Sequence, residues 1–413
     1  MTDNIPGRIR VWLVSQYFPP QITAAAFRLG GLAAYLHRQG MDVTVLTSRC
    51  GRSKAAHTPA DDFAGVRVLR VPVSARSHMG QYLQFLLRAG LRMYSERRHF
   101  PPRAILASSP PLSVLTIGRF LSRHAGAHLF LDIRDLWPDT PAALGRMKPG
   151  SRTFRFFKSY ETRSYQHAAG ISCVSRPMAA RIAAQTSTPV VVAYNGVSAA
   201  DLETAATLAQ PQPPDESGSL RVGYFGNLGL AQGLETLLQA AGQLAAKDFQ
   251  FHLIGDGVKR EELRRRIQAG GLDHVHLHPA RPRADLLAEA ARRFQVLFIN
   301  LAPQAVFSLT IPSKLFDYLL LRRPIVSGLG GEGAEILRRA GCAVCFDPAD
   351  PHSLVTAMQR VSRAWRELRT NAVRNNFSLL QGFLREAQYA KIAEMIHAAT
   401  APSSRSLQTG GPA

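Results

Sequence analysis

Short apolar runs alternate with amphipathic helical patterns along the first half of the chain. An apolar strand pattern begins at Arg10, a helical pattern follows from about Ala24 to Gln39, and the run MDVTVLTS predicts the next strand. A strand, a helix and a second strand in this order form a βαβ unit, which makes the two strands parallel. The alternation continues to about Gly196, so the first half predicts a doubly wound α/β domain.

The same alternation resumes after residues 209–219, a segment rich in proline, glutamine and serine that is typical of a linker. Strand patterns from LRVGYFGN to CAVCFDP predict a second doubly wound, Rossmann-like domain over 220–376. We expect the first domain to cover 1–208, a helix over 377–399 to pack back on it, and 400–413 to form a disordered tail. Two such domains face a cleft, and ligands bind at the carboxyl ends of the strands.

The chain is strongly basic, with 50 Lys and Arg against 29 Asp and Glu and a net charge of +21. This charge suits an anionic partner, which can be a nucleic acid, an acidic lipid or a phosphorylated substrate. A helical pattern over 81–98 has an apolar face and a basic face, formed by Leu83, Leu86, Leu87 and Tyr94 and by Arg88 and Arg92 respectively. Such a helix suits the surface of an anionic bilayer, and equally suits packing on a core with its arginines in solvent.

The sequence pattern does not favour a nucleic acid partner, a membrane-spanning helix or a signal peptide. The basic residues are spread over scaffold elements without a recognisable nucleic-acid-binding module, so we expect no nucleic acid partner. No apolar run approaches the ~18 residues of a membrane span, and the N-terminus does not have the pattern of a signal peptide. We therefore expect a cytoplasmic protein, either free or peripheral on the inner face of the plasma membrane.

Polar residues interrupt an apolar run between Leu309 and Glu335. Pro312 and Ser313 predict the end of a loop, and a helix follows from Lys314. The positive end of a helix dipole and the lysine ammonium both favour an anion at this point. The pattern predicts a site for a diphosphate, although a lysine in solvent is the alternative.

Glycines follow two strand patterns of the second half. Gly226, Asn227 and Gly229 follow the first strand, and Gly255-Asp256-Gly257 follows the next. Glycine permits the close backbone approach that a diphosphate requires, and it is equally common in simple tight turns.

In the first half, Asp132 and Asp135 end a strand pattern in LDIRDLWPD. A carboxylate at the end of a strand can act as a general base, and a cap or turn is the alternative role of Asp135. Arg28, on the first helix, can meet either a phosphate or solvent.

Taken together, these motifs resemble the family-four glycosyltransferases of the GT-B fold. The matching segments are SQYFPPQITAAAFRLGGLAAYLHRQGMDVTVLTS, ILASSPP, LDIRDLWPD, YNG, GYFGNLGLAQGLETLLQAA, HLIGDG, TIPSKLFDYLLLRRPIVSG and GEGAEIL. Each segment alone is a weak signal, whereas their joint order and spacing are specific and extend to about residue 395. The DLWPD and GNLGLAQG forms resemble most closely the bacterial subgroup that transfers amino-deoxy sugars, such as N-acetylfucosamine, in surface polysaccharide assembly.

The resemblance implies a retaining, metal-independent hexosyltransferase that moves a sugar from a nucleotide diphosphate donor, UDP-linked, without a cofactor. The implied acceptor is a glycan or a polyprenyl-diphosphate-linked sugar. The implied catalytic residues are Asp135 and Lys314, and Arg28, Asp132 and Asp135 are the implied acceptor-binding residues. The implied donor-binding residues are Gly226, Asn227, Gly229, Gly255, Asp256, Gly257, Ser313, Lys314, Asp317, Glu332 and Glu335, with Asp317 accepting hydrogen bonds from the ribose hydroxyls.

Two positions depart from the pattern of the family. Leu309 stands where the first glutamate of a glutamate pair is usual, and Gln232 stands where a lysine is usual. These departures indicate either a variant donor pocket or a weakened one. They also favour one alternative function, a catalytically silent nucleotide-sugar-binding subunit. The other alternative is a nucleotide-sugar 2-epimerase, which has the same fold but needs acid and base carboxylates at the donor sugar and no acceptor site.

Overall fold

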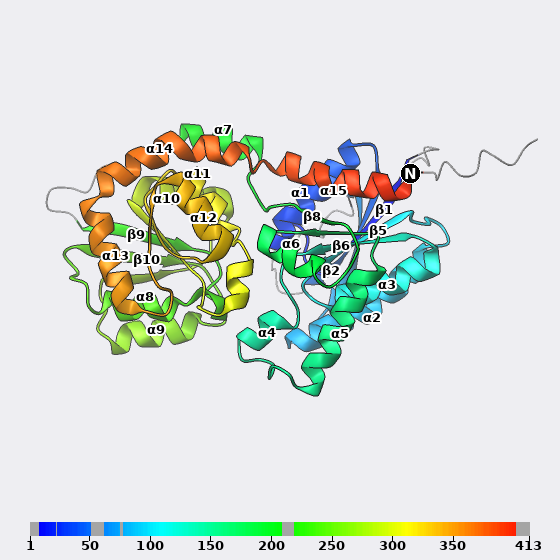
Figure 1. Cartoon of the computed structure of the whole chain (residues 1–413), viewed down its shortest axis with the longest axis horizontal. Coiled ribbons are helices and arrows are strands. Elements are labelled where there is room, and N and C mark those ends of the chain that lie inside the picture. The colour runs from blue at the N-terminus through cyan, green and yellow to red at the C-terminus, as the bar shows by residue number, and fades with distance from the viewer. Residues whose placement is uncertain (1–7, 22, 51–61, 75–76, 209–218, 402–413) are drawn as a thin grey trace, which may run out of the picture.

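The computed structural model describes residues 8–21, 23–50, 62–74, 77–208 and 219–401. The linker predicted at 209–219 and the tail predicted at 400–413 lie almost wholly outside the described residues. Figure 1 shows two α/β units side by side, each a sheet covered by helices.

The first sheet is parallel apart from its antiparallel edge strand β3. Its spatial order is β3-β4-β2-β1-β5-β6-β7-β8. Its strands are β1 (Arg10–Val14), β2 (Asp42–Cys50), β3 (Asp62–Phe63), β4 (Val66–Val73), β5 (Ala104–Ser109), β6 (His128–Ile133), β7 (Gly170–Cys173) and β8 (Val190–Val192). The strand order reverses between β1 and β5, where a doubly wound sheet offers a binding crevice at its carboxyl edge.

The second sheet is wholly parallel among the described strands and has the order β11-β10-β9-β12-β13-β14. Its strands are β9 (Leu220–Phe225), β10 (Phe249–Ile254), β11 (Val275–His278), β12 (Val296–Asn300), β13 (Ile325–Gly328) and β14 (Ala343–Cys345). Here the order reverses between β9 and β12. The prediction of two doubly wound, Rossmann-like domains is confirmed.

Helices cover both sheets. In the first half they are α1 (Ala24–Arg38), α2 (His78–Glu96), α3 (Ser113–Ala125), α4 (Asp139–Ala143), α5 (Arg152–His167), α6 (Arg176–Ala183) and α7 (Ala199–Thr207). In the second half they are η1 (Leu230–Gln232), α8 (Leu234–Ala241), α9 (Arg260–Ala269), α10 (Arg283–Arg293), η2 (Ala305–Leu309), α11 (Lys314–Leu320), α12 (Gly331–Ala340), α13 (Pro351–Arg363), α14 (Trp365–Gln381) and α15 (Arg385–Thr400). Hydroxyl side chains at the N-caps accept hydrogen bonds from first-turn amides of α1, α2, α5, α6 and α7, which fixes where these helices begin.

The chain crosses between the domains twice, at neighbouring points. The N–H of Val197 donates to the carbonyl of Phe383 at 3.1 Å, and the N–H of Arg385 donates to the carbonyl of Val197 at 2.8 Å. Figure 1 shows α14 on the second domain and α15 on the first, joined end to end along one side of the molecule. The helix predicted over 377–399 is thus the end of α14 followed, after a break, by α15.

Helix α7 follows the crossing at Val197 and packs with the second domain. Its Leu202 and Ala205 belong to the same apolar core as Leu315 and Leu319 of α11. The domain predicted over 1–208 therefore includes a helix whose contacts lie in the other domain.

The basic helix α2 spans His78–Glu96, against the predicted 81–98. Its buried face is formed by Phe85, Ala89 and Met93, which pack in the core of the first domain. Leu87 and Leu91 lie on the outside and are 57% and 73% exposed. The helix therefore has a core face and a separate apolar surface. Among the described residues, no helix has both the length and the apolar content needed to cross a bilayer.

Candidate functional site

The glycines after β9 and β10 bring two loops into backbone contact. Gly226 has a φ of 129°, in the region that favours glycine. A Cβ atom on Gly255 would lie 1.8 Å from the carbonyl oxygen of Gly226, and one on Gly257 would lie 2.4 Å from the carbonyl oxygen of Leu228. The structure therefore places these predicted residues together, at the carboxyl ends of neighbouring strands.

Three amides of the first loop are already bonded within the protein. The N–H of Gly226 donates to the backbone carbonyl of Ile254 at 2.9 Å, and the N–H of Leu228 donates to the backbone carbonyl of Asp256 at 2.8 Å. The N–H of Gly229 donates to the side-chain oxygen of Gln232 at 3.1 Å. These three N–H groups therefore have partners inside the protein, and donor binding by Gly226 and Gly229 stays a prediction. The residue that replaces the usual lysine, Gln232, instead fixes the loop.

Lys314 approaches this loop from the start of α11. Its Nζ donates to the hydroxyl of Tyr224 at 2.6 Å and lies 4.0 Å from the centre of that ring. A Cβ on Gly226 would lie 3.1 Å from the same Nζ. Burial lowers the pKa of Lys314 to about 7, and no carboxylate among the described residues forms an ion pair with it. When it is protonated, Lys314 therefore places a positive charge beside the loop that no carboxylate of the described residues balances.

Ser313 and Asp317 flank that charge on the same helix. Ser313 precedes α11 and makes no capping bond with its side chain. Asp317 accepts from Nε and Nη2 of Arg283 at 3.0 and 2.6 Å, both through Oδ1. Arg283 also bonds Asp201 of α7 at 2.6 Å. Oδ2 of Asp317 has no bond to a described residue, so this oxygen can accept from a ligand while Arg283 holds the carboxylate in place.

Glu332 and Glu335 reach across to the first domain. Glu332 is buried and accepts from the backbone N–H and the Nε of Arg176, both at 2.6 Å, and from the hydroxyl of Tyr194, also at 2.6 Å. Glu335 lies 3.4 Å from Arg176. The structure therefore uses Glu332 to join the start of α12 to the start of α6, and the carboxyl edges of the two sheets face each other here.

Leu309, which lacks the carboxylate usual in the family, makes a second contact between the domains. Its carbonyl accepts a hydrogen bond from the hydroxyl of Ser175, the N-cap of α6. Its side chain, with that of Val306, packs against the core of the first domain. An apolar residue is suited to this contact, whereas a carboxylate would lose its hydration.

Asp135 follows β6 at the carboxyl edge of the first sheet. Burial raises the pKa of Asp135 to about 6, against the opposing charge of Arg134. Arg134 itself is held by the hydroxyl of Ser108 at 3.1 Å and the carbonyl of Pro110 at 3.0 Å. No described residue forms a hydrogen bond or ion pair with the Asp135 carboxylate. The pKa of Asp135 is therefore close to neutral pH, which suits a general base.

Arg28 and Asp132 are bonded to each other inside the first domain. Both side chains are essentially inaccessible, and Asp132 accepts from Nε and Nη2 of Arg28 at 3.3 and 2.8 Å. The hydroxyls of Ser108 and Ser172 also donate to the carboxylate of Asp132, each at 2.8 Å. Burial alone would raise the pKa of Asp132, but Arg28 holds this pKa below its ordinary value. This geometry fits a structural pair rather than the predicted acceptor contact, because neither side chain reaches the surface.

Several residues of the site had no signal in the sequence. Tyr224 and Arg283 act through contacts with residues about 90 and 34 positions away, and Arg176 acts across the domain interface.

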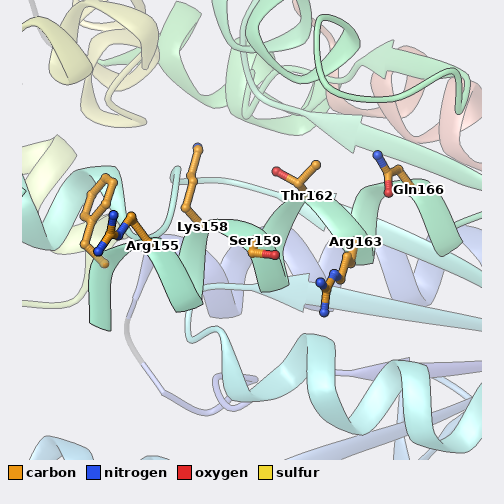
Figure 2. Close-up of a pocket in the computed structure, with 7 residues that line it drawn as sticks. Arg155, Lys158, Ser159, Thr162, Arg163 and Gln166 are labelled. Carbon is orange, nitrogen blue, oxygen red and sulfur yellow. The ribbon is translucent and has the colours of Figure 1, made fainter. Parts of the chain in front are cut away.

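A hollow on the first domain lies apart from these residues. Figure 2 shows that its walls are side chains of α5, which are Phe154, Arg155, Lys158, Ser159, Thr162, Arg163 and Gln166. Lys158 is already paired with Asp139 at 2.7 Å and Glu161 at 2.6 Å. None of the predicted site residues lines this hollow. Among the described residues, no three His, Cys, Asp or Glu side chains gather in a way that could hold a metal ion.

Comparison with known proteins agrees with this architecture. Residues 23–196 match the Glycosyl transferase 4-like domain, and residues 219–364 match the Glycosyl transferases group 1 domain. The Escherichia coli (strain K12) protein WcaI, named as a glycosyl transferase of colanic acid biosynthesis, is 22% identical over 374 residues, which are 83% of this chain and 89% of WcaI.

Solved structures share the fold at low identity. Sucrose-phosphate synthase from Thermosynechococcus elongatus superposes with a TM-score of 0.70 at 15% identity, over 95% of this chain and 99% of that one. Anabaena HepE, solved in complex with UDP and glucose, superposes with a TM-score of 0.67 at 15% identity, over 95% and 100% of the two chains. The chain is therefore a glycosyltransferase of the GT-B fold, built from a Glycosyl transferase 4-like domain and a group 1 domain.

Proposed function

We propose that this protein transfers a hexosyl unit, with retention, from a nucleoside diphosphate sugar to an acceptor hydroxyl in surface polysaccharide assembly, without a metal ion. The observation that carries the proposal is Lys314, an amine that lies beside the crowded glycine loops and forms no ion pair with a carboxylate among the described residues. The relationship to WcaI supports the polysaccharide context. UDP is the proposed nucleotide, which the fold shared with the UDP complex of HepE supports.

The main difficulty of the reaction is the charge that develops as the diphosphate leaves. Lys314 would stabilise this charge from a fixed position, and its surroundings cost no reorganisation during the reaction. Asp317 would accept from the ribose hydroxyls through Oδ2, and the loops that contain Gly229 and Asp256 would form the wall of the nucleotide site. No protein nucleophile is required, because the leaving group departs on the same face that the acceptor enters.

The acceptor would approach Asp135 at the edge of the first sheet. A carboxylate with a pKa of about 6 is ionised at neutral pH and can accept the proton of a hydroxyl as the new bond forms. The proposed acceptor is a glycan or a polyprenyl-diphosphate-linked sugar, and the resemblance to amino-deoxy-sugar transferases makes an N-acetylated deoxyhexose the first donor to try.

A ligand screen followed by turnover tests this proposal. We expect one of the UDP-, GDP- or dTDP-sugars to raise the melting temperature of the protein, because a ligand that binds only the folded state stabilises it. Lys314→Met should abolish transfer, and Lys247→Met, at an exposed position of the same domain, should not. Equal activity of both variants would contradict the role of Lys314.

The same assay separates the two alternative functions. A silent binding subunit, which the replacement at Leu309 favours, would bind the donor without turnover in the presence of any acceptor. A 2-epimerase would change the configuration of the donor sugar in the absence of an acceptor. Transfer of the sugar to an acceptor would reject both.

We also propose that α2 brings the enzyme to an anionic membrane surface, where a lipid-linked acceptor would lie. The helix exposes Leu83, Leu87 and Leu91, which are 56%, 57% and 73% exposed, and Tyr94 and Phe120 of α3 extend this surface at a ring separation of 6.0 Å. Arginines on α2 flank it. Apolar side chains next to arginines fit the interface between acyl chains and anionic headgroups.

Sedimentation with vesicles tests this surface. We expect binding to phosphatidylglycerol vesicles and not to phosphatidylcholine vesicles, and we expect the Arg88→Glu/Arg92→Glu variant to stay in solution. The matched control is Arg264→Glu/Arg265→Glu on α9 of the second domain, which makes the same change of net charge. If both variants sediment equally with the vesicles, α2 is not the surface that contacts the membrane.

A further inference from the structure

Two consecutive residues of β9 hold α11 in place. The hydroxyl of Tyr224 accepts from Nζ of Lys314 at 2.6 Å. The N–H of Phe225 donates to the hydroxyl of Tyr318 at 3.1 Å, and these two rings lie 4.5 Å apart. Lys314 and Tyr318 are one helical turn apart and share a face of α11. The start of α11 is therefore fixed to the end of β9 at two points, of which only the first contacts the lysine amine.

The direction of the hydrogen bonds at Tyr224 is determined by its single proton. Its hydroxyl donates to the carbonyl of Asn227 at 2.5 Å, so it can only accept from Lys314. Asn227 lies in the loop that begins at Gly226. One buried phenol thus connects the lysine to the backbone of the loop, and a movement of either would be transmitted to the other.

A phenol is a chemically informative partner for this lysine. A carboxylate in the same place would neutralise the ammonium and compete with an incoming phosphate. Burial raises the pKa of Tyr224 well above its ordinary value, so the phenol stays neutral wherever the lysine titrates. Its ring face, 4.0 Å from Nζ, adds a further favourable contact for a cation. The pair therefore fixes the position of the charge and leaves the charge itself uncompensated.

We propose that Tyr224 is the positioning residue of the transfer reaction: it holds Lys314 beside the 226–229 loop so that the amine meets the diphosphate of the donor. This inference rests on the proposed function and extends it to a residue that would not touch the substrate. It implies that the diphosphate supplies the counter-ion that Lys314 lacks among the described residues, so donor binding above neutral pH takes up a proton at this amine. Burial, which lowers the pKa of Lys314 to about 7, supports that linkage.

The test compares Tyr224→Phe with Tyr318→Phe. The first keeps the aromatic ring and removes both hydrogen bonds of the phenol, and we expect kcat to fall about 10- to 100-fold with little change in KM for the donor. The alkaline limb of the pH profile of kcat/KM should also move to lower pH, because the charged amine loses an acceptor. Tyr318→Phe loosens the same helix without touching the amine, so its alkaline limb should stay in place.

The pH at which the alkaline limb of kcat/KM falls does not depend on the fraction of folded protein. A loss of stability alone therefore cannot produce the expected shift. If phenylalanine prevents folding, Tyr224→Met provides the same readout. Calorimetry of UDP binding at pH 8, in two buffers of different ionisation heat, should show proton uptake by the wild type and none by Lys314→Met. If Lys314→Met is impaired while Tyr224→Phe keeps the kcat and the alkaline limb of the wild type, Tyr224 is not a positioning residue and the proposed function stands. If Lys314→Met is unimpaired, the proposed function itself fails.

Discussion

The backbone N–H and the Nε of Arg176 both donate to the carboxylate of Glu332 at 2.6 Å and join the two domains. The hydroxyl of Tyr194 adds a third bond to the same carboxylate at 2.6 Å. Arg176 begins α6, whose N-cap Ser175 also bonds the carbonyl of Leu309. The start of one helix in the first domain thus contacts the start of α12 and the end of η2 in the second, next to the site proposed for the donor.

Breaking this contact should open the molecule. In Glu332→Gln the side chain loses its charge and offers an N–H₂ group to three donors, and each lost charge-assisted bond is worth about 1.5–3 kcal/mol. We expect a larger radius of gyration in small-angle X-ray scattering. The matched control is Glu335→Gln, because Glu335 meets the same arginine at 3.4 Å but is 44% exposed. Identical scattering by the wild type and both variants would show that Glu332 does not hold the domains together.

The buried pair of Arg28 and Asp132 should be a major contributor to the stability of the first domain. Asp132→Asn leaves a buried guanidinium without its counter-ion, which costs about 3–5 kcal/mol. We expect a clearly lower urea midpoint for that variant. Asp42→Asn removes the carboxylate that lies 3.8 Å from Arg10 in an exposed pair. This variant should change the free energy of unfolding by less than about 1 kcal/mol.

The same pair has a pH dependence of fixed sign. The folded pKa of Asp132 is depressed below its unfolded value, so its contribution is complete above the unfolded pKa of about 4 and is lost as the pH falls through the folded pKa. The stability difference between wild type and Asp132→Asn should therefore shrink on acidification. A difference that is constant from pH 7 to strongly acid pH would contradict this linkage.

Activity should have a narrow pH optimum because two groups titrate close to neutrality. Asp135, with a pKa of about 6, must lose its proton to act as a base, and Lys314, with a pKa of about 7, must keep its proton to bind the diphosphate. The pH profile of kcat/KM, which reports the free enzyme, should therefore rise through about 6 and fall above about 7. Bound diphosphate raises the lysine pKa, so the alkaline limb of kcat should lie higher than that of kcat/KM.

Variants assign the two limbs of that profile. Asp135→Asn should lose the acid limb together with most of the activity. An acid limb that survives unchanged in this variant belongs to another group, and the assignment of Asp135 as the base would then be wrong.

Local chemistry explains which parts of the site could be predicted from the sequence. Gly226 and Gly255 stood out because a glycine after a strand marks a close backbone approach, and the structure brings these two loops into contact. The alternation of strands and helices likewise predicted both sheets. The sequence offered an acceptor phosphate or solvent as the partner of Arg28, whereas its partner in the structure, Asp132, is 104 positions away. The pairing of Glu332 with the first domain depends in the same way on tertiary packing, which no local pattern encodes.

The contact between the two glycine loops offers the most direct test of the site. In Gly255→Ala the new methyl group would lie 1.8 Å from the carbonyl oxygen of Gly226, which is backbone and cannot turn aside. The loops must separate, at a cost of about 1–3 kcal/mol in stability. The movement should also pull Gly226 away from Lys314, so we expect the thermal shift produced by UDP to disappear. The matched control is Gly90→Ala in α2, where a Cβ would meet no atom within 4 Å. This variant should stabilise the helix by about 0.5–1 kcal/mol. If Gly255→Ala still gives the UDP shift of the wild type, the nucleotide does not depend on the joined loops and the donor site lies elsewhere.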